Sequence, residues 1–316
     1  MIRFFFKPSS FLALGLLALT TAQGWSETVL RVGYQKSSTL FAQKADGTFE
    51  KALAKEGVKV EWKEFTSGPP LLAALAGGSL DFGEVGDAPG IFAQAADAPI
   101  RYVGYLHASP HSVGILVPKN STITSVAQLK GKKVAWAQGS SAHFFLAKAL
   151  QKGGLALADV TPVYLQPPEA RVAFDSGSVD AWAIWDPFFS AAEVGSHGKL
   201  IVDGEGLVPF YGFYFASTAF LDGDGKKLLP AIFAEANAFA ARVGQDHEKT
   251  AQLYAQQLGL PIEVARLFEK RKERYGAYPI DAAAIASQQE AADLFFAQGI
   301  IKKPVKIGDY VWAPAK

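Results

Sequence analysis

The chain has 316 residues, enough for about two domains, and 49% of them are hydrophobic, enough for two packed cores. Its formal net charge of +1 argues against a nucleic-acid-binding protein, because such proteins usually carry a concentrated basic surplus. The chain contains no cysteine, so disulfides, thiolate metal sites, a cysteine nucleophile and a lipidated N-terminal cysteine are all excluded.

The first 22 residues have the pattern of a signal peptide. Arg3 and Lys7 form its basic start, and residues 11–19 form an apolar stretch of about nine residues, too short to span a bilayer. Small residues at 20–22 provide a cleavage site, which we place after Ala22. No other stretch is long and apolar enough for a membrane span. We therefore expect a soluble mature protein in the periplasm, with full secretion as the alternative.

Short strands alternate with helices in the first 117 residues. At 58–65, Val58, Val60 and Trp62 alternate with charged side chains, which is the period of a half-buried strand. Gly47 is a potential interruption of the first helix. The predicted strands are 29–34, 58–65, 80–85, 100–106 and 113–117, and the predicted helices are 41–55, 71–76 and 87–96.

The middle of the chain repeats this alternation, and the last part is helical. Ser125 is the expected N-cap of a short helix at 125–129, and Ser140 or Ser141 begins a helix that runs to 150. From Lys226 onward apolar residues recur at helical spacing, which predicts a packing scaffold. The other predicted elements are a helix at 167–174, a strand after Gly177, and strands at 132–136, 160–164, 200–202 and 210–216.

The same short plan occurs twice in the chain. Residues 31–38 and 133–141 each predict a strand and a serine loop, and residues 78–89 and 177–187 each read Gly-Ser-apolar-Asp, strand, Asp and Pro. Two copies indicate two similar α/β lobes, with ligand loops at the carboxyl ends of their strands. We predict a first lobe of 23–117 plus 211–316, a second lobe of 118–210, and a ligand cleft between them beside a two-strand hinge.

The sharpest local signal is Gly139-Ser140-Ser141 at the start of a predicted helix. A helix N-terminus offers unpaired N–H groups and a partial positive charge, and serine hydroxyls add donors, so the segment predicts an anion site. Ser37 and Ser38 partly echo it in the other copy. The alternative is ordinary N-capping by Ser140.

Aspartates and tryptophans follow the matching strands. Asp87 and Asp186 either cap their helices or orient a ligand. Trp182 and Trp185 differ by an odd number, so a regular strand cannot bury both on one face. Each either lines the cleft, against an apolar ligand tail, or belongs to the core of its lobe.

Other polar residues give weaker signals. Lys36, beside Gln35 in the first loop, is the nearest formal positive charge to the proposed anion site, and Arg171 lies on the helix before the tryptophan strand. Both have a solvent-exposed alternative. Pro110 between His107 and His111 argues against a helical metal pair.

Enzyme signatures are weak. The chain has no Gly-x-Ser-x-Gly elbow, no phosphate-binding loop and no dinucleotide fingerprint. Ser141 and His143 are two residues apart on a helix and do not face each other.

Several segments together resemble the periplasmic aliphatic sulfonate-binding proteins of ABC import systems. The longest is Val-Asp-Ala-Trp-Ala-Ile-Trp-Asp-Pro at 179–187, and the others are 33–36, 78–81, 86–89, 91–96, 139–143 and 170–171. The resemblance implies a type II two-lobed periplasmic binding protein, a monomer that binds a small sulfonate, has no cofactor or metal and catalyses no reaction. It also implies an ABC permease partner in the inner membrane. The predicted ligand-binding residues are Gln35, Lys36, Ser37, Gly68, Asp87, Ser140, Ser141, His143, Arg171, Trp182, Trp185 and Asp186.

The chain departs from this family's pattern in three places, which leaves alternatives for the ligand. Ser37 stands where a glycine is expected, Ala88 where a larger aliphatic residue is usual, and residues 107–111 look unlike the family. These changes would alter the tail end of the pocket and leave the anion end intact. Taurine, which would need a carboxylate such as Glu84 or Asp87, nitrate and a thiamine-pyrimidine precursor are the other ligands. A desulfinase of the same fold uses a cysteine nucleophile, which this chain lacks.

Overall fold

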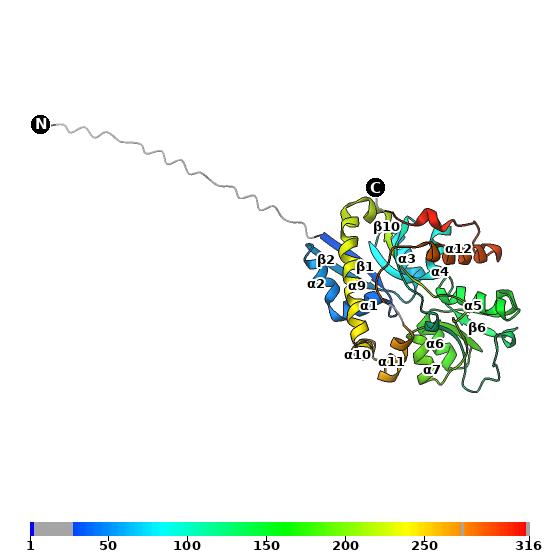
Figure 1. Ribbon diagram of the computed structural model, residues 1–316. Coiled ribbons are helices and arrows are strands. Elements are labelled where there is room, and N and C mark those ends of the chain that lie inside the picture. Colours follow the sequence, from blue (N-terminus) through cyan, green and yellow to red (C-terminus); the bar gives the residue numbers. More distant parts are fainter. Residues whose placement is uncertain (3–27, 273–274, 314–316) are drawn as a thin grey trace.

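The computed structural model describes residues 1–2, 28–272 and 275–313. Two five-stranded sheets form the centres of two lobes, with helices packed against both (Figure 1). The predicted signal peptide and its cleavage site lie outside the described residues, apart from Met1 and Ile2. No helix in the described ranges combines the length and the apolar character that a bilayer crossing needs.

The first lobe is built on a mixed sheet with the strand order β2-β1-β3-β10-β4. β1 is parallel to β2 and β3, whereas β10 is antiparallel to β3 and β4. The strands are β1 (Thr28–Tyr34), β2 (Val58–Glu64), β3 (Phe82–Gly86), β4 (Ile100–Leu106) and β10 (Gly212–Ser217). The helices are α1 (Thr39–Asp46), α2 (Thr48–Ala54), α3 (Gly68–Ala76) and α4 (Asp87–Ala95). Gly47, at a φ of 69°, separates α1 from α2 at the interruption that the sequence predicts.

The second lobe repeats this topology with the strand order β7-β6-β8-β5-β9. β6 is parallel to β7 and β8, and β5 is antiparallel to β8 and β9. The strands are β5 (Val113–Val117), β6 (Lys133–Trp136), β7 (Thr161–Tyr164), β8 (Ala181–Trp185) and β9 (Lys199–Asp203). The helices are α5 (Ser141–Lys152), α6 (Pro167–Asp175) and α7 (Phe188–Gly195). The short helix expected at 125–129 is a 3₁₀ turn, Val126–Leu129, with Ser125 as its N-cap.

The C-terminal third is helical, as its spacing predicts. Helices α9 and α10 cover one face of the first sheet with α1 and α2, while α12 packs against α4 on the other (Figure 1). Helix α11 reaches the second lobe, where it packs against α7. These helices are α8 (Thr218–Asp222), α9 (Leu229–Gln245), α10 (His247–Leu258), α11 (Ile262–Arg271) and α12 (Ala282–Ala297).

The repeated Gly-Ser-apolar-Asp segment makes the same connection in both lobes. Asp81 accepts a hydrogen bond from the Arg31 amide at 2.8 Å, and Asp180 accepts one from the Lys133 amide at 2.8 Å. In each lobe the aspartate therefore ties the start of the third strand of the repeat to the first. The repeat seen in the sequence is a structural repeat.

One predicted lobe boundary needs a correction. The sequence analysis ends the first lobe at residue 117, but β5 pairs with β8 and β9 in the second sheet. The chain therefore crosses between Leu106 and Val113, and it returns between Asp203 and Gly212. Its hydrophobicity could not assign β5, because a fully buried strand reads the same in either sheet.

The two crossing segments contact each other and form a hinge. The Ser109 amide donates to the carbonyl of Pro209 at 3.0 Å, and the Gly204 amide donates to the carbonyl of Pro110 at 3.1 Å. His111 lies 2.9 Å from an Asp203 carboxylate oxygen and 3.5 Å from one of Glu205. We call residues 107–112 and 204–211 the hinge segments.

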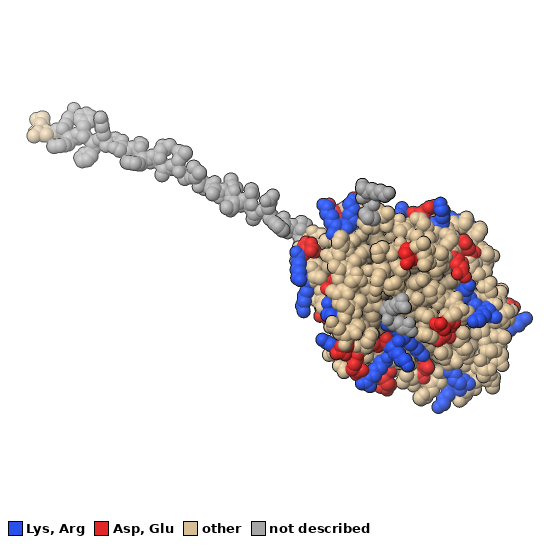
Figure 2. Space-filling view, viewed as in Figure 1, with Lys and Arg blue, Asp and Glu red and all other residues tan. Residues whose placement is uncertain are grey.

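Acidic and basic side chains are interspersed on the face shown in Figure 2, with no large area of a single sign. This mixed surface agrees with the small net charge of the whole sequence.

Candidate functional site

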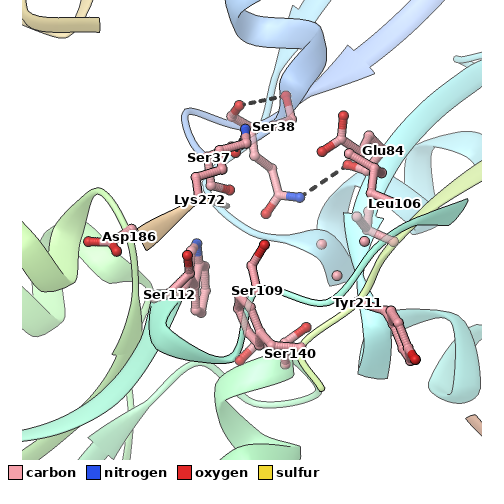
Figure 3. A pocket seen from close by; sticks show the side chains of 18 of the residues that line it. Ser37, Ser38, Glu84, Leu106, Ser109, Ser112, Ser140, Asp186, Tyr211 and Lys272 are labelled. Atoms are coloured by element: carbon pink, nitrogen blue, oxygen red, sulfur yellow. Dashed lines mark hydrogen bonds between the residues drawn. The ribbon is translucent and has the colours of Figure 1, made fainter. Parts of the chain in front are cut away.

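A cavity lies between the lobes where the loops after the paired strands meet the hinge (Figure 3). The centre of a water molecule can occupy about 90 Å³ of this cavity. Both lobes, both hinge segments and the C-terminal helices contribute to its walls. The lining residues are Gln35, Ser37, Ser38, Gly68, Glu84, Val85, Gly86, Pro89, Leu106, His107, Ser109, Ser112, Ser140, Ser141, Trp185, Asp186, Phe210, Tyr211, Gly212, Phe268 and Lys272.

The serine loops of the two lobes have the same backbone arrangement. Ser38 donates its hydroxyl to the Gln35 carbonyl at 2.8 Å, and Ser140 donates to the Ala137 carbonyl at 2.7 Å. Each serine is the N-cap residue of the helix that follows. The Ser38 oxygen also accepts a hydrogen bond from the amide of its helix, whereas Ser140 makes no such side-chain cap. Ordinary side-chain capping therefore does not explain Ser140.

The N-terminus of α1 is already occupied by a carboxylate. Glu84, on β3, accepts hydrogen bonds from the amides of Thr39 at 2.9 Å and Leu40 at 3.3 Å. These are first-turn amides that have no partner within the helix. The first lobe thus uses its own side chain where a bound anion would otherwise lie.

The first-turn amides of α5 have no such carboxylate partner in the described part of the chain. Among the described residues, no hydrogen-bond acceptor contacts the amides of Ser141 or Ala142. Aligning the two copies on their Gly-Ser-apolar-Asp segments places Ala183 at the position of Glu84. An alanine methyl group cannot accept a hydrogen bond, so this helix end keeps unpaired N–H donors and its partial positive charge.

The two lobes touch at Gly86 and Ser141. A Cβ atom on Gly86 would lie 2.1 Å from the Ser141 hydroxyl oxygen, so this contact requires glycine. The neighbouring Asp87 is buried and accepts a hydrogen bond from the Ala88 amide, while its second carboxylate oxygen has no partner among the described residues. Burial raises the pKa of Asp87 to about 7, against the opposing hydrogen bond from Ser141.

Asp186, the matching residue of the second lobe, has a clearer structural role. It accepts hydrogen bonds from the amide and the hydroxyl of Ser190, in the first turn of α7, as the capping alternative predicts. Burial also raises the pKa of Asp186 to about 7, while the nearby Arg271 opposes this shift. The next residue toward the N-terminus, Trp185, lines the cavity.

Lys272 is the positive charge that lines the cavity, in place of the predicted Lys36. Its ammonium donates to the Ser37 carbonyl at 2.7 Å and lies against the rings of Tyr254, Phe268 and Tyr275. Burial lowers the pKa of Lys272 and raises that of Glu84, and each charge favours the ionised form of the other. The pair is neutral overall whether or not the proton has moved between them. Lys36 lies outside the lining and is 4.0 Å from a Glu64 oxygen.

Four other predicted site residues also lie outside the cavity lining: Asp87, His143, Arg171 and Trp182. Trp182 is fully buried against Phe174 in the core of the second lobe, which leaves Trp185 as the tryptophan of the pair at the cavity. Arg171 bonds Asp175 at 2.7 Å and Ser196 at 2.7 Å, which directs it along its own lobe.

His143 supports the serine loop from behind rather than lining the cavity. Its Nδ1 accepts a hydrogen bond from the Gly139 amide at 3.3 Å, and its ring packs against Phe92 and Phe295. Burial lowers the pKa of His143 to about 4, so its ring is neutral at neutral pH. His143 therefore helps to position the loop that carries Ser140 and Ser141.

The remaining predicted residues come together at the cavity. The lining includes Gln35, Ser37, Gly68, Ser140, Ser141, Trp185 and Asp186. Asp87 follows the lining residue Gly86 in the chain. Sequence reasoning missed the hinge residues His107, Ser109 and Ser112, and also Tyr211, Phe268 and Lys272. The unusual segment 107–111 was the one available signal for part of this set.

Comparisons with known proteins identify relatives over nearly the whole chain. The NMT1/THI5-like family model matches residues 36–209. A protein of Escherichia coli (strain K12) named as an aliphatic sulfonates-binding protein is 39% identical over 96% of this chain and 95% of its own length. A protein of Bacillus subtilis (strain 168) with the same name is 39% identical over 89% of this chain and 85% of its own length.

A solved structure also matches. The alkanesulfonate-binding protein SsuA from Xanthomonas axonopodis pv. citri, bound to MOPS, is 38% identical and covers 90% of this chain and 98% of its own chain, with a TM-score of 0.85. The two-lobed architecture is therefore shared with a periplasmic-type binding protein.

Proposed function

This chain belongs to the family of aliphatic sulfonate-binding proteins, and we propose that it binds an organosulfonate in the cleft as the solute-binding component of an ABC import system. The relatives are binding proteins, and we propose binding without turnover for this chain as well. Its sulfonate group would lie at the N-terminus of α5, against the amides of Ser141 and Ala142 and the hydroxyl of Ser141.

The observation that carries this assignment is the unequal state of the two helix ends. Glu84 fills the N-terminus of α1, and Ala183 leaves the N-terminus of α5 without an internal acceptor. A sulfonate stays a monoanion at neutral pH, so neutral amides and hydroxyls can hold it without any proton transfer. One helix end therefore fits one anionic group.

The rest of the cavity suits a ligand with a tail. Trp185, Phe210, Tyr211 and Phe268 provide aromatic surface, and Val85, Pro89 and Leu106 provide aliphatic surface. Sulfate and nitrate carry nothing that would cover this surface. We therefore expect tailed sulfonates to bind more tightly than either inorganic anion.

The carboxylates of the cavity do not favour taurine. Both oxygens of Glu84 already accept amide hydrogen bonds, and its charge faces Lys272. Asp87 lies outside the cavity lining. Of the two carboxylates that the sequence offered for an ammonium group, Glu84 is therefore already bonded and Asp87 is not at the cavity surface.

The location follows from the same family. We propose that the first 22 residues direct export and that the mature protein meets its permease partner on the outer side of the inner membrane. Contacts between the lobes, such as Ser67 to Gln166 at 2.7 Å and Gly86 to Ser141, would present the closed shape to that partner.

The test is a thermal-shift panel of ethanesulfonate, butane-1-sulfonate, an arylsulfonate, taurine, sulfate, nitrate and a thiamine precursor. A ligand that binds only the folded protein raises the melting temperature by mass action. We expect shifts with the tailed sulfonates and none with sulfate or nitrate. A shift with nitrate or the precursor alone would contradict the sulfonate assignment, and product formation in the same mixtures would contradict binding without turnover.

A further inference from the structure

The hinge segment 107–112 brings polar side chains to the cavity at a place separate from the N-terminus of α5. His107, Ser109 and Ser112 all line the cavity, on the connection from β4 to β5. The proposed sulfonate site does not use any of them.

Ser112 carries a buried hydroxyl with no partner. Its amide donates to the Ser109 carbonyl at 3.0 Å, and its carbonyl accepts from the Asp186 amide at 2.9 Å. The residue is 6% exposed, and its hydroxyl oxygen has no hydrogen-bond partner among the described residues. A buried hydroxyl without a partner is unfavourable, so a ligand group that hydrogen-bonds to Ser112 would relieve this cost, whereas an apolar group would not.

Ser109 offers a second hydroxyl from the same turn. The Ser109 amide donates to the carbonyls of Pro209 and Phe210 on the other hinge segment, and these bonds fix the backbone position of Ser109. Its side chain points into the cavity in Figure 3, and no hydrogen bond of its hydroxyl occurs among the described residues. The hinge therefore presents the Ser109 hydroxyl to whatever fills the cavity, with the buried hydroxyl of Ser112 in the same turn.

The charge of the same cavity indicates which polar group would match these hydroxyls. Lys272 is held in the wall by Ser37 and by three aromatic rings, and its charge is balanced by Glu84, whose oxygens already accept amide hydrogen bonds. An ammonium group on the ligand would therefore find no unpaired partner in Glu84, whereas a neutral hydroxyl or ether needs no charged partner. A hydroxyl can also both donate to and accept from serine.

We propose that Ser109 and Ser112 form a second recognition point, which selects sulfonates that carry a neutral hydrogen-bonding group on the tail over plain alkanesulfonates. This proposal rests on the proposed function, because it names the class of sulfonate that the same cleft takes. It assigns the hinge a role in specificity as well as in joining the lobes.

The test compares 3-hydroxypropane-1-sulfonate with butane-1-sulfonate by isothermal titration calorimetry on the purified protein. The two ligands have the same number of non-hydrogen atoms and differ in a hydroxyl against a methyl group. We expect the hydroxylated ligand to bind about tenfold more tightly, as one buried hydrogen bond allows. 3-Aminopropane-1-sulfonate should bind more weakly than the hydroxylated ligand.

The variants Ser112→Ala and Ser109→Ala should bring the affinity ratio of the two ligands close to one, because they weaken binding of the hydroxylated ligand more than binding of butane-1-sulfonate. Ser178→Ala, which removes a hydroxyl group outside the cavity lining, should leave the affinity ratio unchanged. A melting curve of each variant reports on its folding. Equal affinities in the unmodified protein would overturn the inference alone, as would serine variants that weaken both ligands equally. Binding of neither sulfonate would overturn the proposed function and the inference with it.

Discussion

The two lobes share one plan and differ in what fills the N-terminus of the helix after their first strand. In the first lobe Glu84 accepts hydrogen bonds from the amides of Thr39 and Leu40 and so occupies the N-terminus of α1. In the second lobe Ala183 stands at the matching position and the end of α5 stays open. One side chain on a neighbouring strand therefore decides whether the first amides of the repeated helix are occupied or left unpaired.

The largest effect is expected when a carboxylate is introduced at the N-terminus of α5, as Glu84 provides one at the N-terminus of α1. Ala183→Glu should place a carboxylate at α5 and lower the affinity for butane-1-sulfonate by at least about 100-fold, because the ligand would meet a buried like charge. Calorimetry measures the affinity.

Ala183→Gln is the matched control, since it adds a similar volume without the charge. Ala183 is fully buried, so both variants are overpacked, and circular dichroism must show that each still folds. Equal losses for Glu and Gln would show that volume, and not charge, governs the site.

A second prediction concerns the contact that the C-terminal helices of the first lobe make with the second lobe. Arg271, at the end of α11, donates to Ser190 at 3.1 Å and to Glu193 at 2.5 Å, and its guanidinium stacks on Phe189. Arg271→Ala should weaken sulfonate binding about tenfold, mainly through faster dissociation, because the closed form loses a contact between the lobes.

Stopped-flow measurement of ligand release would show this change. The control is Arg266→Ala on the same helix, because Arg266 pairs with Glu248 inside the C-terminal helices. An unchanged release rate in Arg271→Ala would mean that this contact does not stabilise the closed form.

The smallest expected effect comes from Asp87, which lies behind the open helix end. Its folded-state pKa of about 7 lies above its ordinary value of 3.8, so the buried carboxyl is largely protonated below pH 7. A bound anion favours the protonated form. Sulfonate affinity should therefore stay constant up to about pH 7 and fall severalfold by pH 8, whereas Asp87→Asn should remove most of this fall.

The same raised pKa links Asp87 to stability. Relative to Asp87→Asn, the unfolding free energy of the native protein should be highest below about pH 4 and decrease as the pH rises through about 7. Urea titrations at several pH values would measure this. Asp186, whose pKa is also raised to about 7, is present in both proteins and cancels from the difference.

Local patterns predicted the repeat, because the glycines, serines and aspartates of each copy have local roles. Gly47 breaks a helix, Asp81 and Asp180 each bond the first strand of their copy, and Ser140 is the N-cap of α5. The odd spacing of Trp182 and Trp185 predicted that one regular strand face could not hold both, and Trp182 lies in the core while Trp185 lines the cavity.

Residues brought in from distant parts of the chain could not be predicted in this way. Lys272 reaches the first loop from 235 residues further along the chain, so no window of sequence contains both partners. Glu84 looks like any strand residue until β3 is placed against the start of α1. His143 gave a polar signal, but its burial behind the loop depends on packing from α4 and α12.

The positions of the strands along the chain set the order in which the two sheets can form. All five strands of the second sheet lie between residues 113 and 203, so this sheet can close once that stretch has emerged. Strand β4 must wait, because its described partners, β10, Tyr278 and Val311, all come after residue 211. During export from the N-terminus onward, the second lobe can therefore fold first. The first lobe keeps an unpaired strand edge until the last third of the chain has been exported.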